Sequence, residues 1–297
     1  ASYQELRREH LREYPAGLPI ASGVFSLDDL ADGLINSIRG FESPTVAYFH
    51  VYPPHEPYAP AREFAGLFDD GWAPIEKPNH PLSRALHPLD EILANRLRYD
   101  QYLATWDAQF ARVLETLQTS GLLDRSIVVL TSDHGELFER GEIGHNTFVF
   151  ADPVVHVPLL ISLPGQSERK DIRAFTSSVD LLPTIASLVG AETPAWHEGR
   201  LLPGLGGEDD PDRGIYAIDA KTASSFSSFK QYSISLMKQR HRLIHYQYSY
   251  YSGFEFYNME ADPEELTDLF PSKPALALQM KDELLQTIAD FNRPYEK

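Results

Sequence analysis

The chain has 297 residues and a net charge of −17 at pH 7, from 26 Lys and Arg against 43 Asp and Glu. Its hydrophobic content of 42% is typical of a globular protein, and its length allows one large domain or a domain with an appendage. The negative charge disfavours nucleic acids and anionic membranes as partners. If the substrate is an anion, a bound metal ion is the usual means of overcoming this charge locally.

The absence of cysteine excludes disulfides, thiolate metal sites and a cysteine nucleophile among these residues and leaves the compartment undecided. The longest apolar stretch, 154–163, is too short to cross a bilayer, which takes about 20 residues. The first 15 residues lack the apolar core of a signal peptide. We therefore expect a soluble protein with no membrane span and no targeting segment in these residues.

In chain order, the pattern first predicts helices over 4–14 and 26–38. The second begins at Ser26, a typical N-cap residue, and Asp28-Asp29 fits its first turn better than a pair of metal ligands. The β-rich run 45–52 predicts a strand. A polar, proline-rich loop follows and extends to about residue 90.

Apolar residues at helical spacing predict a long amphipathic helix over 90–117, which Gly121 ends. The continuous apolar run 126–133 is typical of a strand buried on both faces of a parallel sheet. It places Asp133 at the carboxyl end of a strand, where ligands gather in open α/β sheets.

The rest of the pattern predicts an apolar strand over 157–163, a helix from Ser178 to near Gly190, and then a change of architecture beyond about residue 213. There the pattern predicts a small antiparallel sheet with a final helix over 274–291 packed on it. The four short strands of this sheet are expected over 214–219, 232–238, 242–248 and 255–258.

Three polar clusters carry candidate chemistry, and each ends or follows a predicted strand: PPHEPY (53–58), TSDHGE (131–136) and GEIGHN (141–146). Asp133 and His134 side by side suit a hard or borderline divalent cation. Taken singly, each cluster has a plainer interpretation. Asp133 could cap a helix, and the histidines could be polar loop residues.

These clusters, in this order, resemble segments of the sulfatase family of the alkaline phosphatase superfamily. The resemblance covers most of the chain from about Thr45. It is carried by five segments: PHEPY (54–58), 98–136 ending in TSDHGE, GEIGHN with VVHVPLLI (154–161), SVDLLPTIASLVG (178–190) and FEFYNMEADPEELTDL (254–269).

The resemblance implies an alkaline-phosphatase-like three-layer α/β sandwich with a mostly parallel central sheet, plus a small carboxyl-terminal antiparallel sheet with one packed helix. The corresponding division is a partial sulfatase-type α/β domain over 1–212 and an α+β subdomain over 213–297. The implied activity is metal-dependent hydrolysis of sulfate esters. Phosphate or phosphonate ester hydrolysis, phosphotransfer, and a non-catalytic member that binds a glycan or a protein are the alternatives.

Residue by residue, the resemblance makes Asp133 and His134 metal ligands. It makes His55 a catalytic, substrate-binding residue that contacts or protonates the transferring group. His145 stands where many relatives place a lysine, so it would bind an anionic oxygen of the substrate. The implied cofactor is one divalent ion, with calcium, manganese and zinc not distinguished. The implied partner is an anionic small-molecule or glycan sulfate or phosphate ester, and homo-oligomers are possible.

Two family features are not found in this sequence. Relatives begin with a strand that ends in metal-binding aspartates, followed by a nucleophile in a Cys/Ser-x-Pro-x-Arg motif. Formylglycine, the modified nucleophile of sulfatases, is therefore expected only outside these residues. The absence of the nucleophile motif from this sequence favours either an incomplete chain or the non-catalytic alternative.

Overall fold

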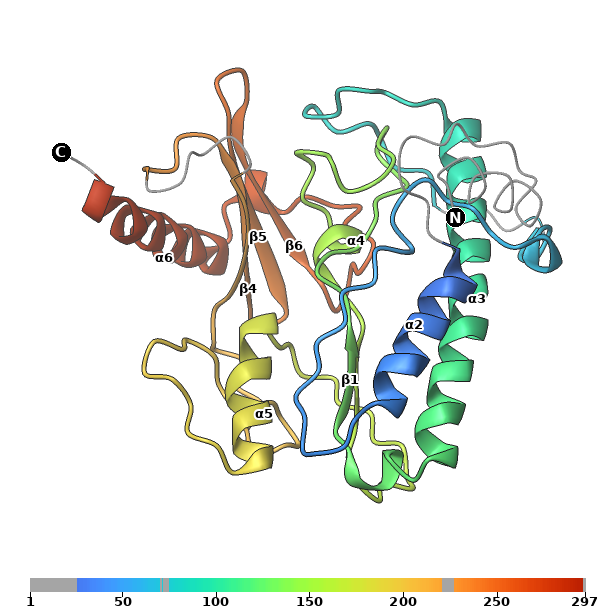
Figure 1. Ribbon diagram of the computed structural model, residues 1–297. Helices are drawn as coiled ribbons and strands as arrows, with labels where there is room; N and C mark the ends of the chain where they lie inside the picture. The colour runs from blue at the N-terminus through green and yellow to red at the C-terminus, as the bar shows by residue number, and fades with distance from the viewer. Residues whose placement is uncertain (1–25, 70, 72–74, 221–226, 296–297) are drawn as a thin grey trace. The chain divides into compact units, whose positions relative to one another are not determined.

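The computed structural model describes residues 26–69, 71, 75–220 and 227–295, which form two compact units (Figure 1). The predicted helix over 4–14 lies outside the described residues. The first unit takes the described parts of 1–79, 84–145 and 157–168, and the second takes those of 80–83, 146–156 and 169–297. The chain passes between the units several times, and the division at residue 212 stays a prediction.

Apart from the strand predicted over 45–52, the predicted helices and strands of the first unit that lie among the described residues occur in the predicted order. The helices and strands of this unit are α2 (Leu27–Arg39), η1 (Arg62–Phe64), α3 (Leu89–Thr119), η2 (Leu123–Arg125), β1 (Val128–Thr131) and β2 (Leu159–Ser162). Those of the second unit are α4 (Asp152–Val155), η3 (Ser178–Asp180), α5 (Leu181–Val189), β3 (Ile215–Asp219), β4 (Tyr232–Lys238), β5 (His241–Gln247), β6 (Ser252–Asn258), η4 (Phe270–Ser272), α6 (Ala275–Asn292) and η5 (Arg293–Tyr295).

Helices α2 and α3 form the helical layer of the first unit. The N-cap prediction is confirmed, because the Ser26 side chain accepts a hydrogen bond from the backbone N–H of Asp29 at 3.3 Å. The two helices share an apolar cluster that includes Ile35 and Val113. Asp28 forms an ion pair with Arg112 of α3, in keeping with its interpretation as a first-turn residue.

Strands β1 and β2 are confirmed, but the environment predicted for the first of them, a position buried on both faces of a parallel sheet, is wrong. They pair antiparallel, with Val128 opposite Ser162 and Thr131 opposite Leu159. In β1, Val128 to Leu130 are only half-buried and Thr131 is exposed, so this strand is not buried on both faces. An apolar run favours a strand but does not specify the direction of its neighbour, which depends on the connection between the strands.

The strand predicted over 45–52 is also wrong. The segment is extended but belongs to no sheet among the described residues, and Val46 and Tyr48 are 90% and 84% exposed. A β-rich composition produces a strand only where a partner supplies the hydrogen-bond ladder. The predicted loop after it is confirmed for the described residues up to Pro88, and among these the one helical segment is the short η1.

The second unit confirms the prediction for the carboxyl-terminal part. Its four strands form an antiparallel sheet in the order β3-β4-β5-β6, and α6 packs on it. Leu236 and Leu243 of the sheet and Met280 and Leu284 of the helix have no exposed surface. Alternating strand residues and one stripe of the helix therefore share a single apolar core.

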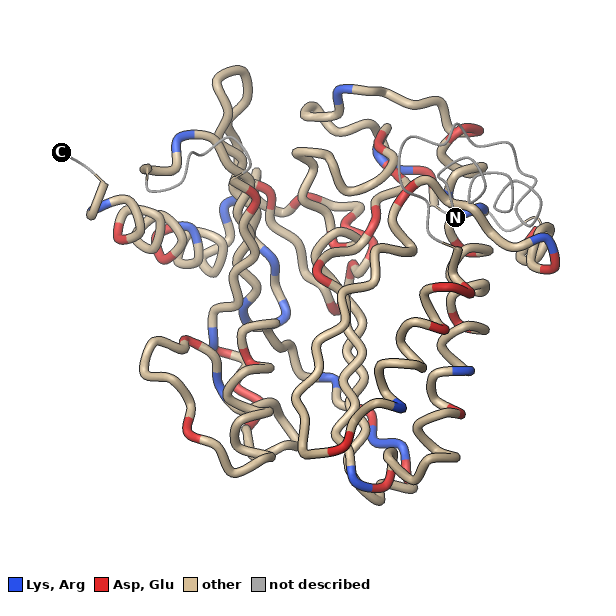
Figure 2. The backbone as a smooth tube through the Cα atoms, in the orientation of Figure 1, with Lys and Arg blue, Asp and Glu red and all other residues tan. Residues whose placement is uncertain are grey.

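The surface chemistry agrees with the composition. Acidic positions occur in both units and outnumber basic ones, 43 to 26 in the whole sequence (Figure 2). Among the described residues, no helix combines the length and the apolar character needed to cross a bilayer.

A buried ion pair fixes the start of α5. Asp180 has no exposed surface and accepts hydrogen bonds from the Arg213 guanidinium at 2.7 and 2.8 Å and from the backbone N–H groups of Arg200 and Ser177. Burial alone would raise the pKa of Asp180, but these donors outweigh it and hold the pKa below its usual range. The carboxylate therefore stays charged and paired.

Replacing Arg213 should strongly destabilise the second unit, because it leaves a buried carboxylate without its counter-ion. We expect Arg213→Gln to lower the free energy of unfolding by about 3 kcal/mol, measured from urea unfolding curves. Arg200→Gln is the matched control, since its side chain pairs with Asp210 at the surface and should contribute less than about 1 kcal/mol. An equal loss of unfolding free energy in the two variants would contradict the conclusion that the buried Asp180–Arg213 pair stabilises the second unit.

The lowered pKa of Asp180 also predicts a pH dependence. A carboxyl whose folded pKa lies below its unfolded value stabilises the fold above the unfolded pKa of about 3.9 and loses this contribution as pH falls through the folded pKa. The stability gap between the wild type and Asp180→Asn should therefore narrow below about pH 4. Thermal unfolding across pH 7 to 3 measures it, and a gap that does not change with pH would refute the prediction.

Candidate active site

The three polar clusters of the sequence meet in the first unit. The imidazole rings of His134 and His145 are stacked with centroids 3.9 Å apart, and those of His55 and His145 are 4.8 Å apart. Asp133 lies next to His134, with Oδ1 and Nε2 3.8 Å apart. The structure thus brings all four predicted site residues together, while their roles stay a prediction.

A short backbone bridge places His145 beside the strand end. Leu137 and Gly144 exchange two backbone hydrogen bonds, with N···O distances of 3.2 and 2.9 Å. In an antiparallel bridge the residues that flank a bonded pair also face each other, so Glu136 and His145 become neighbours. Gly144 has φ +88°, a conformation that favours glycine, and an added Cβ would lie 3.4 Å from the Glu136 carboxylate.

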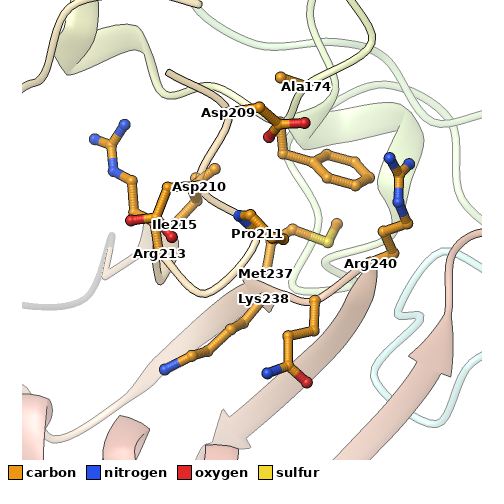
Figure 3. A pocket seen from close by; sticks show the side chains of 11 residues that line it. Ala174, Asp209, Asp210, Pro211, Arg213, Ile215, Met237, Lys238 and Arg240 are labelled. Atoms are coloured by element: carbon orange, nitrogen blue, oxygen red, sulfur yellow. The ribbon is translucent and has the colours of Figure 1, made fainter. Parts of the chain in front are cut away.

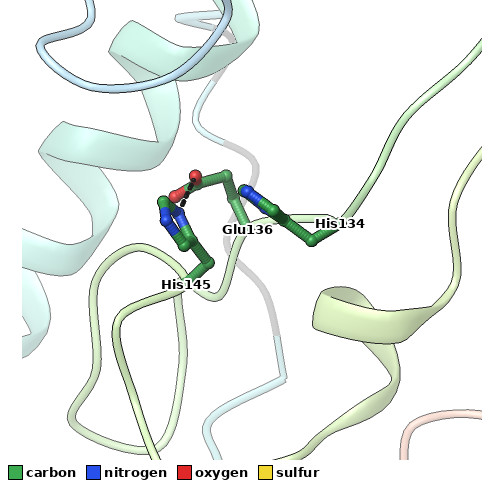
Figure 4. Close-up of side chains that lie close together, drawn as sticks. All are labelled: His134, Glu136 and His145. Atoms are coloured by element: carbon green, nitrogen blue, oxygen red, sulfur yellow. Dashed lines mark hydrogen bonds and ion pairs between the residues drawn. The ribbon is translucent and has the colours of Figure 1, made fainter. Parts of the chain in front are cut away.

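Glu136 connects the three clusters, and the sequence prediction missed it. Its Oε1 lies 2.8 Å from His145 Nδ1, and its Oε2 accepts a hydrogen bond from the Tyr58 hydroxyl at 2.7 Å. Its side chain is only 5% exposed. Figure 4 shows the His145 ring against this carboxylate and the His134 ring pointing toward it. Because a carboxylate only accepts hydrogen bonds, the proton of His145 lies on Nδ1.

Tyr58, also missed, joins this carboxylate to the apolar core of the unit. Its ring packs against Tyr99 of α3 and against Phe138, with centroids 5.4 and 5.7 Å away. Burial, followed by the charge of Glu136, raises the pKa of Tyr58 well above its usual range, and the same causes raise the pKa of Tyr99 to about 12. The Tyr58 phenol therefore stays protonated and remains a donor to Glu136.

His55 is held by its own turn. Its backbone N–H donates to the Tyr52 carbonyl at 3.1 Å, and its ring packs on the Tyr52 ring with centroids 4.4 Å apart. Nδ1 donates to the Glu56 carbonyl at 2.6 Å, because a carbonyl oxygen can only accept. Nε2 is then the nitrogen that remains for a ligand, with the Tyr52 hydroxyl 3.5 Å away.

Asp133 and His134 have the geometry of two ligands of one cation. His134 Nδ1 donates to the Gly135 carbonyl at 3.1 Å, which leaves the lone pair of Nε2 for a metal. Two ligands that each lie about 2.0–2.4 Å from one ion can be at most about 4.8 Å apart, and these atoms are 3.8 Å apart. The Asp133 side chain is 67% exposed, so further ligands can reach it. These residues therefore fit a divalent metal ion.

The second unit has a pocket of a different character. It lies between Phe175, Pro211 and Met237 (Figure 3). Two of its cationic side chains are already paired, since Arg213 binds Asp180 and Lys238 binds Glu283 at 2.7 Å. No histidine lines this pocket. We therefore place the candidate active site in the first unit, where three imidazoles lie together.

Comparison with known proteins agrees with this arrangement. The family model "Sulfatase" matches residues 11–191, and the model "N-sulphoglucosamine sulphohydrolase, C-terminal" matches residues 141–290. The multifunctional alkaline phosphatase superfamily protein PehA of Trinickia caryophylli is 27% identical over 80% of this chain and 54% of its own length. N-acetylglucosamine-6-O-sulfatase of Bacteroides thetaiotaomicron is 29% identical over 67% of this chain and 37% of its own.

Among solved structures, the phosphonate monoester hydrolase of Silicibacter pomeroyi matches with a TM-score of 0.69 and 20% identity, over 98% of this chain and 69% of that one. This likeness confirms the predicted α/β fold class. The chain spans about half or less of the length of the curated relatives named above. Because the first family model covers more than half of the 297 residues, this chain belongs to the sulfatase family.

Proposed function

We propose that the protein is a metal-dependent hydrolase of sulfate esters and that this chain supplies part of its active site. The observation that carries the proposal is the convergence of His55, His134 and His145 beside Asp133, all in contact within one unit. Membership of the sulfatase family and the sulfatases among its relatives support sulfate esters as the substrate class.

Each residue has a role that follows from its position. Asp133 and His134 would hold the cation, which would neutralise and polarise the sulfate oxygens when bound. His145 is oriented by Glu136 through Nδ1, so Nε2 is the atom that would bind a sulfate oxygen. To donate to that oxygen the ring would carry a second proton, on Nε2, as imidazolium. His55 presents Nε2 and, as the doubly protonated imidazolium, would give its Nε2 proton to the leaving alkoxide, a contribution worth about 10²–10⁴ in rate for a well-placed general acid.

The local positive charge matters because the chain as a whole is acidic. A net charge of −17 repels an anionic ester until a cation and imidazole donors compensate for it at the site. The imidazole at His134 leans toward manganese or zinc more than an all-oxygen site would, although calcium remains compatible.

The substrates that relatives name guide the choice of ester. One relative is an N-acetylglucosamine-6-O-sulfatase, which supports a sulfated sugar as the first substrate to test. The phosphonate monoester hydrolase with the same fold supports phosphonate and phosphate esters as the second candidate class. A non-catalytic member would bind such esters without turnover.

A substrate panel tests the proposal on the full-length protein with saturating divalent metal. The panel contains 4-nitrophenyl sulfate, glucosamine 6-sulfate, 4-nitrophenyl phosphate and a 4-nitrophenyl phosphonate monoester. We expect sulfates to be hydrolysed with the highest kcat/KM, EDTA to abolish the activity, and His134→Ala to lower it by about 100-fold or more through loss of the metal. His87→Ala, which removes a surface ion pair with Glu91, is the control and should keep full activity. Binding without turnover would establish the non-catalytic alternative.

Substitutions of Glu136 test the orientation of His145. Glu136→Leu removes both hydrogen bonds and should lower kcat/KM by about 10–100-fold, as loss of such orienting partners typically does. Glu136→Gln keeps an oxygen that accepts from His145 and should retain most of the activity. Steady-state kinetics of both variants, with circular dichroism to confirm folding, make the measurement. An equal loss in both variants would show that orientation is not the role of Glu136.

A further inference from the structure

A histidine of the second unit is buried where the carboxyl-terminal helix packs on the antiparallel sheet. His245 of β5 has 5% of its surface exposed, and its register partners are Ile234 of β4 and Phe254 of β6. Alternation along β5 places its side chain on the same face as Leu243, which packs with Met280 of α6. The imidazole therefore lies in the apolar layer between the sheet and α6.

Aromatic rings surround this imidazole. It lies nearly parallel to the Phe254 ring, with centroids 4.0 Å apart and planes at 4°, and it meets the Tyr232 ring edge-on at 5.4 Å. Phe254 stacks in turn on Phe270 of η4, with centroids 5.1 Å apart. The Tyr232 hydroxyl lies 3.5 Å from Nδ1 of His245, which is the outer limit of a hydrogen bond. Packing, more than polar contacts, therefore holds the ring.

The charges around His245 oppose a proton on it. Lys281 of α6 is the charged group whose field acts on the ring, and its Nζ lies 5.1 Å from the Phe254 centroid, so Phe254 already attracts one cation. Among the described residues, no carboxylate forms an ion pair with His245. Asp268, after β6, accepts from two backbone N–H groups, and Glu255 points to the opposite face of β6.

These surroundings define a pH range. Burial, followed by the charge of Lys281, lowers the pKa of His245 to about 4, whereas an unfolded histidine has a pKa of about 6.5. Between these values the unfolded chain binds a proton that the folded unit does not, so stability falls as pH falls from about 6.5 to about 4. Asp180 acts below about pH 4, so the two ranges are separate.

We propose that His245 is a pH-sensitive element whose protonation separates α6 from the sheet. An imidazolium requires water or an anion, and this apolar layer offers neither, so protonation favours the state in which the helix is displaced. Displacement exposes Leu243, Met280 and Leu284, which have no exposed surface in the packed state. The element belongs to the packing of the second unit and does not depend on the proposed hydrolysis.

Hydrogen exchange of the full chain, read by mass spectrometry at pH 7 and pH 5, measures this opening. Protection factors of peptides from α6 correct for the intrinsic pH dependence of exchange. Between pH 7 and pH 5, protection in the wild type should fall about 20-fold more than in His245→Gln and His245→Phe, which do not take up a proton. The glutamine keeps a polar group beside Tyr232, and the phenylalanine keeps a ring against Phe254, so either variant can serve if the other does not fold.

Two further variants separate the role of His245 from general acid sensitivity. Lys281→Glu replaces the opposing charge with a counter-ion and should reduce the extra loss of protection by about threefold or more. His241→Gln is the matched control, because His241 lies on the same strand and stacks on Phe256 at 5.2 Å, but is only partly buried. This variant should keep the pH dependence of the wild type.

Three results would overturn the proposal. The first is an equal fall in α6 protection in the wild type and in the folded variants of His245. The second is a pH dependence that Lys281→Glu leaves unchanged, and the third is a loss of pH dependence in His241→Gln as large as that in the His245 variants. Because α6 protection is measured without substrate or metal, its outcome is independent of the test of hydrolysis.

Discussion

The hydrogen bonds of Glu136 are the interaction on which the candidate site depends. A carboxylate that is almost fully buried is costly unless partners satisfy it, and here Tyr58 and His145 each bind one oxygen. These partners come from segments separated from it by 78 and 9 positions in the sequence. One buried charge therefore holds the proline-rich loop, the end of β1 and the loop that carries His145 in fixed positions around the imidazoles.

Backbone hydrogen bonds and ring packing next to Glu136 hold the surrounding segments in place. The bridge between Leu137 and Gly144 closes a tight loop, and Gly144 allows the backbone to turn with a positive φ that other residues rarely adopt. The Tyr58 ring, whose hydroxyl donates to Glu136, packs on Tyr99 and Phe138. Rigid support of this kind keeps an imidazole oriented before a ligand arrives, which lowers the cost of binding and of reaction.

Much of the fold could be predicted from the sequence because its signals are local. Periodic apolar residues located α3, a capping serine located the start of α2, and alternating residues with turns located the second unit's sheet. Strand pairing could not be predicted in the same way. The direction of β2 beside β1, and the absence of any ladder for 45–52 among the described residues, depend on contacts between distant segments.

The residues of the site also differ in whether a local pattern could identify them. His55, Asp133, His134 and His145 could be found because each lies in a short cluster after a predicted strand, and the order of the clusters resembled a family. Glu136 and Tyr58 stood in those clusters too, but a glutamate or a tyrosine near a histidine is common. Their importance arises from burial and from a contact across 78 positions, which no local pattern encodes.

The exposed segment 45–52 has a consequence for how the protein behaves in solution. Val46 and Tyr48 occupy positions i and i+2 of an extended backbone, so they project on the same side and form a short apolar ribbon. An extended segment without a ladder partner is a template for another strand, and polypeptides use such edges for strand addition as readily as for unwanted self-association. The segment 45–52 is therefore a place where an added strand would meet extended backbone that belongs to no sheet among the described residues.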